Sequence, residues 1–351
     1  MFPHERVVVR RGPESGLPII VAVHSTSRGP AIGGCRLKSY PDWRAGLSDA
    51  LRLSAAMTDK CALAGLPHGG GKTVVVLPPD GAWSRPAAQP LHGDASRAAA
   101  QPPDGDASRA AALHDVGTTI AELAGAYATG PDVGTGPDDM AVIGERTEHV
   151  FCRPDRSGDS SPATAAGTVA ALRALCEHRF GSPDLSRRSF AILGLGRVGG
   201  AIAGLLRDSR LVVSDLDESR RVPGAAWTSP EECLRADVDV LVPAALGGVL
   251  TAATVPTLRC AAIAGPANNQ LDRDDTAALL YDRGIVFAPD AVVSAGGIIY
   301  ATGIELRGRT PAEARADVEA IGDTLGRLLR AAAAQGLPPA EVARRMAATA
   351  A

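Results

Sequence analysis

Two lysines, Lys60 and Lys72, flank a short stretch that ends in three glycines at residues 69–71. Lys72 directly follows these glycines and precedes an apolar run at residues 73–77, which is typical of a buried strand. A lysine is most often a solvated surface charge. In a dry cleft, however, burial lowers its pKa and the amine can transfer protons. From spacing alone, both explanations stay open for these lysines.

A third polar group, Asp132, lies in the sequence GPDVGT at residues 130–135. Carboxylates are frequent in Gly/Pro turns because they hydrogen-bond to the backbone of the turn itself. On the residues alone, that structural role is the more common explanation. A carboxylate that shares a cleft with a lysine could instead serve in general acid–base catalysis.

A glycine-rich turn, GLGRVG at residues 194–199, follows a predicted strand at 189–193 and precedes a predicted helix at 198–207. In a dinucleotide site Gly194 would permit the tight bend, Gly196 would let the backbone approach a pyrophosphate, and Gly199 would let the helix pack on the strand. The N-terminus of the helix then favours the phosphate charge. This context predicts a dinucleotide site.

Asp215 ends the next predicted strand, 19 residues after Gly196, close to the spacing of about 20 typical of this motif. Its carboxylate is expected to accept hydrogen bonds from the ribose hydroxyls. It would also repel a 2′-phosphate, so the predicted cofactor is NAD rather than NADP. Arg220 and Arg221 follow shortly afterwards and weaken that preference slightly.

The length of 351 residues predicts two domains, since a domain averages about 150 residues. Hydrophobic residues make up 45% and charged residues 21%, which excludes a wholly disordered chain. The net charge of −3 offers no basic excess for a nucleic acid. The sequence shows neither an apolar run of about 18 residues nor a signal-peptide pattern, so we expect no membrane partner and a cytoplasmic location. Six scattered cysteines without a CxxC pair predict reduced thiols and no metal site.

Hydrophobic periodicity predicts a strand hairpin at residues 6–24, a helix at 46–57, a helix at 162–179 and a helical tail at 311–350. Beyond residue 162, short apolar strands alternate with helical segments. These strands are expected at residues 189–193, 211–214, 239–243, 260–264 and 285–288. Such alternation indicates a parallel sheet with helices on both faces.

Residues 79–112 differ in composition and contain the octapeptide GDASRAAA twice, at 93–100 and at 105–112. The repeat is shorter than the units of solenoid proteins, which run about 20–50 residues. We interpret the segment as a low-complexity insertion that forms a largely disordered surface loop.

Several motifs together resemble the amino-acid dehydrogenases that act on glutamate, leucine, phenylalanine and valine. In chain order they are GPAIGGCR at 29–36, MTDKCALAGLPHGGGKT at 57–73, GPDVGT at 130–135, GLGRVG at 194–199, PAALGG at 243–248, AGPANN at 264–269 and APDAVVSAGG at 288–297. The resemblance runs from His4 to about Arg309 and is interrupted by the insertion. It is greatest for the phenylalanine, valine and leucine branch.

The resemblance implies reversible, NAD-dependent oxidative deamination of an L-amino acid to a 2-oxo acid and ammonia. By position, Lys60 would hold the substrate carboxylate. Lys72 would polarise the 2-oxo group and activate water, and Asp132 would shuttle protons to and from the amino group. The resemblance implies further cofactor contacts beyond Gly194, Gly196, Gly199 and Asp215, namely Arg36, Ser160, Thr164, Arg197, Val198, Ala244, Ala245 and Asn268.

The resemblance also implies a substrate pocket that includes Ile32, Gly33, Met57, Gly130, Ser294, Ile298 and Ala301. Glutamate-specific members carry a lysine at the position of Ile32, so a buried side-chain carboxylate would be left unpaired here. An apolar substrate is therefore expected: phenylalanine, valine or leucine. Ser294 stands where the family usually has asparagine, and a serine reaches less far.

The expected fold is α/β with two domains. An N-terminal α/β catalytic domain would span 1–150, a Rossmann NAD-binding domain 155–297, and C-terminal helices at 298–351 would return to the first domain. The resemblance places NAD and the amino acid in the cleft between the domains and implies a homo-oligomer. The alternative, favoured by Ser294 and the insertion, is a catalytically weak NAD-binding sensor or interaction protein.

Overall fold

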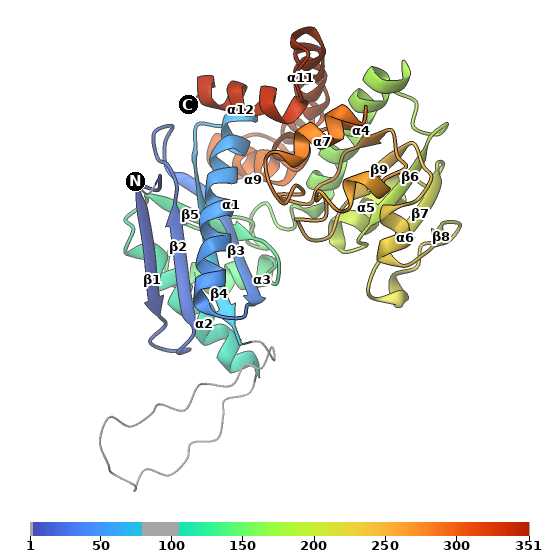
Figure 1. The fold of residues 1–351 in the computed structure, drawn as a ribbon. Helices are drawn as coiled ribbons and strands as arrows, with labels where there is room; N and C mark the ends of the chain where they lie inside the picture. Colours follow the sequence, from blue (N-terminus) through green and yellow to red (C-terminus); the bar gives the residue numbers. More distant parts are fainter. Residues whose placement is uncertain (1–2, 79–104, 351) are drawn as a thin grey trace, which may run out of the picture. The chain divides into compact units, whose positions relative to one another are not determined.

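The computed structural model describes residues 3–78 and 105–350. The chain divides into two compact units, one of Met1–Thr58 with His68–Gly158 and the other of Asp59–Pro67 with Asp159–Ala351. Each unit is built on its own sheet (Figure 1). The two-domain α/β class expected from the sequence is confirmed.

The first unit holds a five-stranded mixed sheet in the order β1-β2-β4-β3-β5. The predicted hairpin is confirmed, because β1 and β2 pair antiparallel, and the apolar run after Lys72 lies in β4. Strand β4 pairs antiparallel with β2, whereas β3 is parallel to both β4 and β5. The bounds are β1 Arg6–Arg11, β2 Pro18–Val23, β3 Ala31–Ser39, β4 Gly69–Leu77 and β5 Tyr127–Pro131.

Helices cover both faces of this sheet (Figure 1). Helix α1 (Trp43–Leu63) packs Ala50 against Ile20 and Val74 on one face. Helices α2 (Gly105–Ala121) and α3 (Pro137–Gly144) bury apolar side chains on the other face, among them Leu113 and Met140. Arg36 and Lys72 alternate with the side chains that face α2, so both belong to the α1 side.

The predicted disordered insertion at 79–112 is wrong for its last part. Residues 79–104 lie outside the described residues, but the second octapeptide copy at 105–112 forms the first two turns of α2. Alanine has the highest helix propensity of the amino acids. Ala112 is also fully buried in the core next to Leu113, so packing stabilises the helix as well.

The second unit holds a six-stranded sheet in the order β11-β10-β9-β6-β7-β8. All of its pairings are parallel, which confirms the parallel sheet predicted from strand–helix alternation. The bounds are β6 Ser189–Leu193, β7 Arg210–Ser214, β8 Ala226–Trp227, β9 Val240–Pro243, β10 Ala262–Ile263 and β11 Val286–Phe287.

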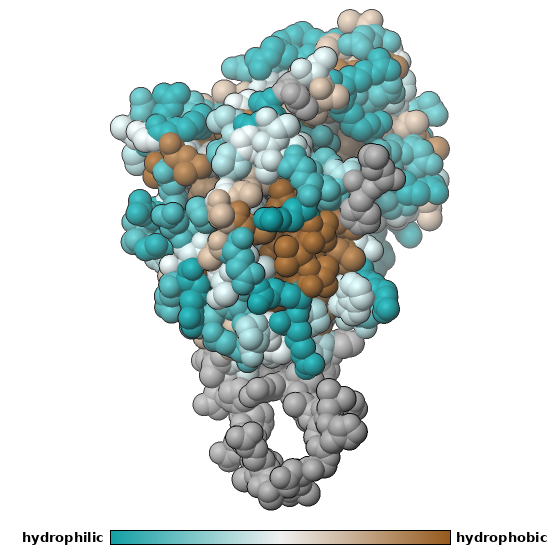
Figure 2. All heavy atoms as spheres, turned by 90° about the vertical axis from the view of Figure 1, so that its left-hand side faces the viewer, coloured by the Kyte–Doolittle hydropathy of each residue, from teal (hydrophilic) through white to brown (hydrophobic). Residues whose placement is uncertain are grey.

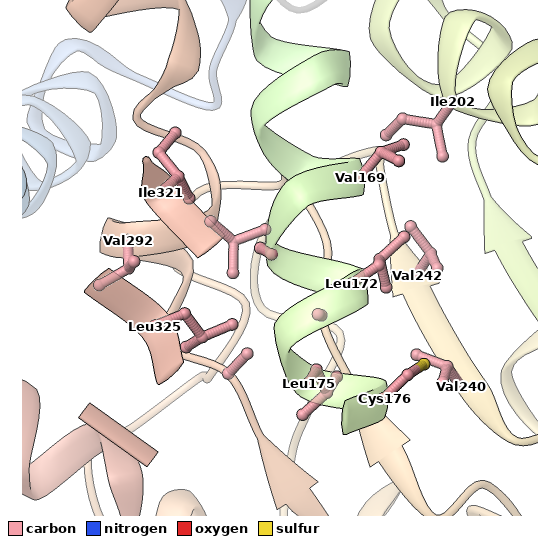
Figure 3. Close-up of a cluster of buried hydrophobic side chains, with 14 of the residues drawn as sticks. Val169, Leu172, Leu175, Cys176, Ile202, Val240, Val242, Val292, Ile321 and Leu325 are labelled. Atoms are coloured by element: carbon pink, nitrogen blue, oxygen red, sulfur yellow. The ribbon is translucent and has the colours of Figure 1, made fainter. Parts of the chain in front are cut away.

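The helices of the second unit are α4 Ser161–Phe180, α5 Arg197–Leu205, α6 Pro230–Leu234, α7 Thr276–Asp282, α8 Asp290–Val293, α9 Gly296–Arg307, α10 Pro311–Glu319, α11 Ile321–Gln335 and α12 Pro339–Ala350, with short 3-10 turns at Glu218–Arg220 and Val255–Thr257. Helix α4 lies at the centre of the core. Figure 3 shows Val169 and Leu172 of α4 facing Ile202 and Val242 on one side. Ile321 and Leu325 of α11 lie on its other side.

The C-terminal helices differ from the expected arrangement, because residues 298–351 cluster with the second unit instead of the first. Helix α11 carries a strongly one-sided apolar face that includes Leu325, Leu328 and Leu329, all fully buried. This face packs against α4, whose small residues allow close approach. The burial of that apolar surface accounts for the difference.

Candidate active site

The first unit brings Lys72 and Asp132 into direct contact, although they are 60 positions apart in the chain. The Nζ of Lys72 donates to Oδ2 of Asp132 at 2.5 Å, and Nε of Arg36 donates to the same oxygen at 2.9 Å. The side chains of Lys72 and Asp132 are 5% and 13% exposed. Two cations thus share one carboxylate in a mostly water-excluded setting.

The strand register explains why these groups meet. Strand β3 lies between β4, which carries Lys72, and β5, which leads into Asp132. Gly34 of β3 leaves the space that the pair occupies, because a Cβ there would lie 2.8 Å from Cβ of Asp132 and 3.3 Å from Nζ of Lys72. Gly34 was not predicted as a site residue, although it is the third glycine of the GPAIGGCR motif.

The environment changes the acid–base properties of both groups. Burial lowers the pKa of Lys72, the neighbouring charge of Asp132 opposes that change, and Arg36 reinforces it. For Asp132, burial alone would raise the pKa, but the charges of Lys72 and Arg36 outweigh it and hold the pKa well below its usual range. The carboxylate is therefore ionised, and the amine gives up its proton more readily than a solvated lysine.

The turn that carries Asp132 is itself fixed. The backbone N–H of Asp132 donates to Oγ1 of Thr135 at 2.9 Å, and the Thr135 hydroxyl donates to the carbonyl of Cys35 at 2.8 Å. Arg109 of α2 donates to the Gly134 carbonyl at 2.7 Å and pairs with Asp139 at 2.8 Å. The second octapeptide copy thus supports the loop of Asp132, a role that its composition did not predict.

The other pocket residues expected in the first unit lie on the same elements. Ile32 and Gly33 are in β3, Gly130 is in β5, and Met57 is in α1. A Cβ on Gly33 would lie 1.9 Å from the Gly71 carbonyl oxygen, so this glycine is required for strand packing. A Cβ on Gly130 would lie 3.9 Å from the Gly33 carbonyl oxygen and from Cβ of Phe151, so it would make ordinary contacts without a clash.

The predicted dinucleotide turn has the conformation that its glycines suggested. Gly194 has a φ of 105°, a region that side chains rarely adopt. Gly196 is the N-cap of α5, and a Cβ on Gly199 would lie 2.0 Å from the Gly194 carbonyl oxygen. Arg197 and Val198 form the first turn of this helix. The backbone N–H groups at the N-terminus of this helix suit a pyrophosphate.

Asp215 follows β7 and lies beside this turn. Its Oδ2 accepts the Leu195 N–H at 2.6 Å, and its Oδ1 accepts the Asp217 N–H at 3.0 Å. Burial alone would raise the pKa of this carboxyl, but the two backbone donors and Arg220 lower it overall. Nη1 of Arg220 lies 3.5 Å from Oδ2 of Asp215, so a positive charge lies beside this carboxylate.

The remaining expected cofactor residues of the second unit lie close to the turn or to the start of α4. Ala245 and Ala244 pack against Gly194 and Gly199 respectively. Ser160 is the N-cap of α4, and Thr164 lies one turn further along. Both hydroxyls lie next to Gly297 of α9, which has no side chain to cover them.

A second polar cluster joins three other predicted residues. Lys60, in the last turns of α1 and part of the second unit, donates to Oδ1 of Asn268 at 2.7 Å. Ser294 donates to the carbonyl of Asp290 at 2.5 Å and reaches Asn268 Oδ1 only at 3.5 Å. The Ser294 hydroxyl thus hydrogen-bonds mainly to the backbone of its own helix. Ile298 and Ala301 lie nearby in chain order, in α9.

Within the described ranges, no group of three or more His, Cys, Asp or Glu side chains is placed to hold a metal ion. The six cysteines are buried and form no disulfide bond with one another. Among the helices that the structure describes, none is long and apolar enough to cross a membrane.

Comparison with known proteins places this geometry in a family. Residues 4–101 match the model described as Glu/Leu/Phe/Val dehydrogenase, dimerisation domain. Residues 208–310 match the model described as Glutamate/Leucine/Phenylalanine/Valine dehydrogenase. The chain belongs to the Glu/Leu/Phe/Val dehydrogenase family. It is therefore an amino-acid dehydrogenase, an oxidoreductase that acts on CH–NH₂ groups.

Relatives with different named substrates are almost equally similar to this dehydrogenase. The L-tryptophan dehydrogenase of Nostoc punctiforme is 36% identical over 98% of this chain and 92% of its own. The leucine dehydrogenase of Bacillus cereus is 35% identical over 99% of this chain and 90% of its own. The crystal structure of the Nostoc punctiforme enzyme aligns with a TM-score of 0.74 at 33% identity, over 99% of this chain and 96% of that one. The family is thus established, whereas the substrate is not.

Proposed function

We propose that the enzyme catalyses the reversible, NAD-dependent oxidative deamination of an apolar L-amino acid to its 2-oxo acid and ammonia. The observation that carries this proposal is the buried Lys72–Asp132 pair, because it combines a proton acceptor of lowered pKa with an ionised carboxylate. The named relatives are dehydrogenases, which does not favour the alternative of a non-catalytic sensor.

The proposed roles follow from the chemistry of each side chain. Lys60 binds the substrate carboxylate, and Asn268 orients the Lys60 ammonium. The nicotinamide ring, when bound, supplies the hydride acceptor. Neutral Lys72 removes a proton from the water that attacks Cα, and Asp132 moves protons to and from the leaving nitrogen. The fixed turn around Asp132 keeps its carboxylate in place during these transfers.

An apolar substrate suits the residues around the pair. Ile32 is 1% exposed and offers no cation for a second carboxylate, whose burial would be costly. Gly130 carries no side chain that would narrow the proposed pocket. One methylene changes discrimination by about 1–3 kcal/mol, so phenylalanine, leucine and valine stay close competitors. Tryptophan joins them because a tryptophan dehydrogenase is among the relatives.

Initial rates of NADH formation at alkaline pH test the substrate class. We expect turnover with at least one of L-phenylalanine, L-leucine, L-valine and L-tryptophan. L-Glutamate should be slower by at least about 10²-fold, because its side-chain carboxylate would be buried unpaired. A preference for glutamate over every apolar amino acid would contradict the proposal.

The preference for NAD over NADP depends on Asp215. Asp215→Ser removes the charge that repels a 2′-phosphate, while Arg220, which also pairs with Asp217, stays nearby as a cation that attracts it. We expect the ratio of kcat/KM values for NAD and NADP to fall by about 10- to 100-fold. Glu218→Ser, an exposed carboxylate on the following turn, is the matched control. An unchanged ratio in Asp215→Ser would remove Asp215 from cofactor selection.

We also propose that the enzyme is a homo-oligomer that acts in the cytoplasm. Among the described residues, strand β1 pairs only with β2, and the matched model for residues 4–101 is named a dimerisation domain. Figure 2, which views the molecule from the side of β1 in Figure 1, shows a hydrophobic patch, and Val9 of β1 is 44% exposed. Light scattering that gives a monomer mass would contradict the oligomer.

A further inference from the structure

Arg36 connects two carboxylates in the interior of the first unit. Its Nε donates to Asp132 Oδ2 at 2.9 Å, and its Nη1 donates to Asp49 Oδ2 at 2.9 Å. The side chain of Arg36 is only 9% exposed. The family resemblance implied that this arginine contacts the cofactor, yet its guanidinium pairs with the two acids. The planar fork of an arginine can bridge two such acceptors, whereas a lysine presents a single point charge.

Asp49, in α1, is held from several directions. Its Oδ2 also accepts the Tyr40 hydroxyl at 2.6 Å, and its Oδ1 accepts Nη2 of Arg52 at 2.9 Å. Asp49 is 12% exposed, so these contacts are mostly shielded from water. A continuous chain of polar contacts therefore runs from Tyr40 through Asp49 and Arg36 to Asp132.

We propose that Arg36 is a positioning residue: it fixes the Asp132 carboxylate against Lys72, and Asp49 with Tyr40 fixes Arg36 in turn. The proposal rests on the function proposed above, in which Asp132 and Lys72 carry the proton transfers. Both cations bind Oδ2 of Asp132, and among the described residues no donor lies on Oδ1. That second oxygen is thus the one presented to a substrate amino group.

The bridge also sets the charge balance at Lys72. The charges that act on Lys72 are those of Asp132, Arg36 and Asp49, whereas the thiol of neighbouring Cys35 belongs to the opposite face of the sheet. Burial raises the pKa of that thiol to about 12, so it stays uncharged. Arg36 is then the one cation near Lys72 within this group, and its charge opposes protonation of the lysine. Loss of the charge should raise the pKa of Lys72 and shift its neutral form to higher pH.

The chain is well suited to a direct test, because it contains only three lysines: Lys38, Lys60 and Lys72. Protein labelled with ¹³C at lysine Cε gives three side-chain signals, and Lys72→Arg assigns one of them. In Arg36→Gln we expect the Lys72 titration midpoint to rise by on the order of one pH unit. In Arg36→Lys, which keeps the charge, the rise should be smaller.

Steady-state kinetics test the positioning role. We expect kcat/KM for deamination to fall about 10- to 100-fold in Arg36→Gln, with its ascending pH limb displaced to higher pH. Tyr40→Phe, which removes one hydrogen bond, should show the same changes to a smaller extent, with circular dichroism confirming the fold. Arg10→Gln breaks a surface pair with Glu122 in the same unit and is the control. It should move neither the Lys72 titration nor the pH profile.

The outcomes separate this proposal from its premise. An unchanged titration midpoint of Lys72 in Arg36→Gln, together with weaker NAD binding, would overturn the positioning role of Arg36. It would instead support a contact between Arg36 and the cofactor. Lower activity with unshifted pH dependence in Arg36→Gln would also overturn it, as a structural effect. A shifted midpoint in a protein that turns over no amino acid would support the bridge and reject the proposed function.

Discussion

Lys72→Arg is expected to lower kcat for deamination by about 10²- to 10⁴-fold, the range of general acid–base catalysis. The substitution keeps a cation beside Asp132, but a guanidinium does not deprotonate at any working pH. The proton acceptor is therefore lost while the ion pair that fills the site is kept. NAD affinity, measured by fluorescence titration, should stay unchanged, because the predicted cofactor residues of the glycine-rich turn belong to the other unit.

Lys72→Ala provides the complementary variant. Arg36 still pairs with Asp132 there, so the buried carboxylate keeps a partner and the fold should survive. Lys38→Arg is the control, since it leaves the charge over the Tyr40 ring in place. Turnover of either Lys72 variant within about tenfold of the native enzyme would reject Lys72 as the proton acceptor.

Asp132→Asn is expected to reduce kcat by about 10²- to 10⁴-fold, as in Lys72→Arg, but for a different reason. The amide is isosteric but cannot accept a proton, and it no longer compensates the charges of Arg36 and Lys72. Because the charge of Asp132 raises the pKa of Lys72, its removal should move the lysine midpoint to lower pH. This shift of the Lys72 titration midpoint is opposite in sign to the shift expected in Arg36→Gln.

The ¹³C-lysine titration and the rate of NADH formation measure these two effects separately. Asp138→Asn, an exposed carboxylate at the start of α3, is the matched control in the same loop region. Full activity in Asp132→Asn, or a lysine midpoint that rises, would show that the carboxylate does not act on Lys72 as proposed.

Local pattern was enough to predict the glycine-rich turn and the strands of the second sheet other than β8. Each of those strands is a short apolar run, and the positive φ at Gly194 is a property that only glycine meets easily. Strand β3 was not predicted, because Gly33, Gly34 and Arg36 interrupt its apolar pattern. Strand β3 lies between β4 and β5 because it pairs with both, and such long-range pairing cannot be predicted from a local sequence pattern.

The candidate site was predicted in its members but not in its connections. Lys72 and Asp132 came from a glycine-rich context and a family resemblance, and the structure adds their contact. The role of Arg36 could not be predicted, since its partners lie 13 and 96 positions away in the chain. The support of the Asp132 loop by Arg109 was hidden for another reason, because a repeated Ala-rich octapeptide is typical of an insertion.

The proposed function is the deamination of an apolar L-amino acid with NAD. Its most direct test is the stoichiometry of products after incubation of the purified enzyme with NAD and the fastest amino acid of the panel, at alkaline pH. We predict NADH, ammonium and the 2-oxo acid in equal amounts. NADH without ammonium would contradict oxidative deamination, and bound NAD without any product would identify a non-catalytic member of the family.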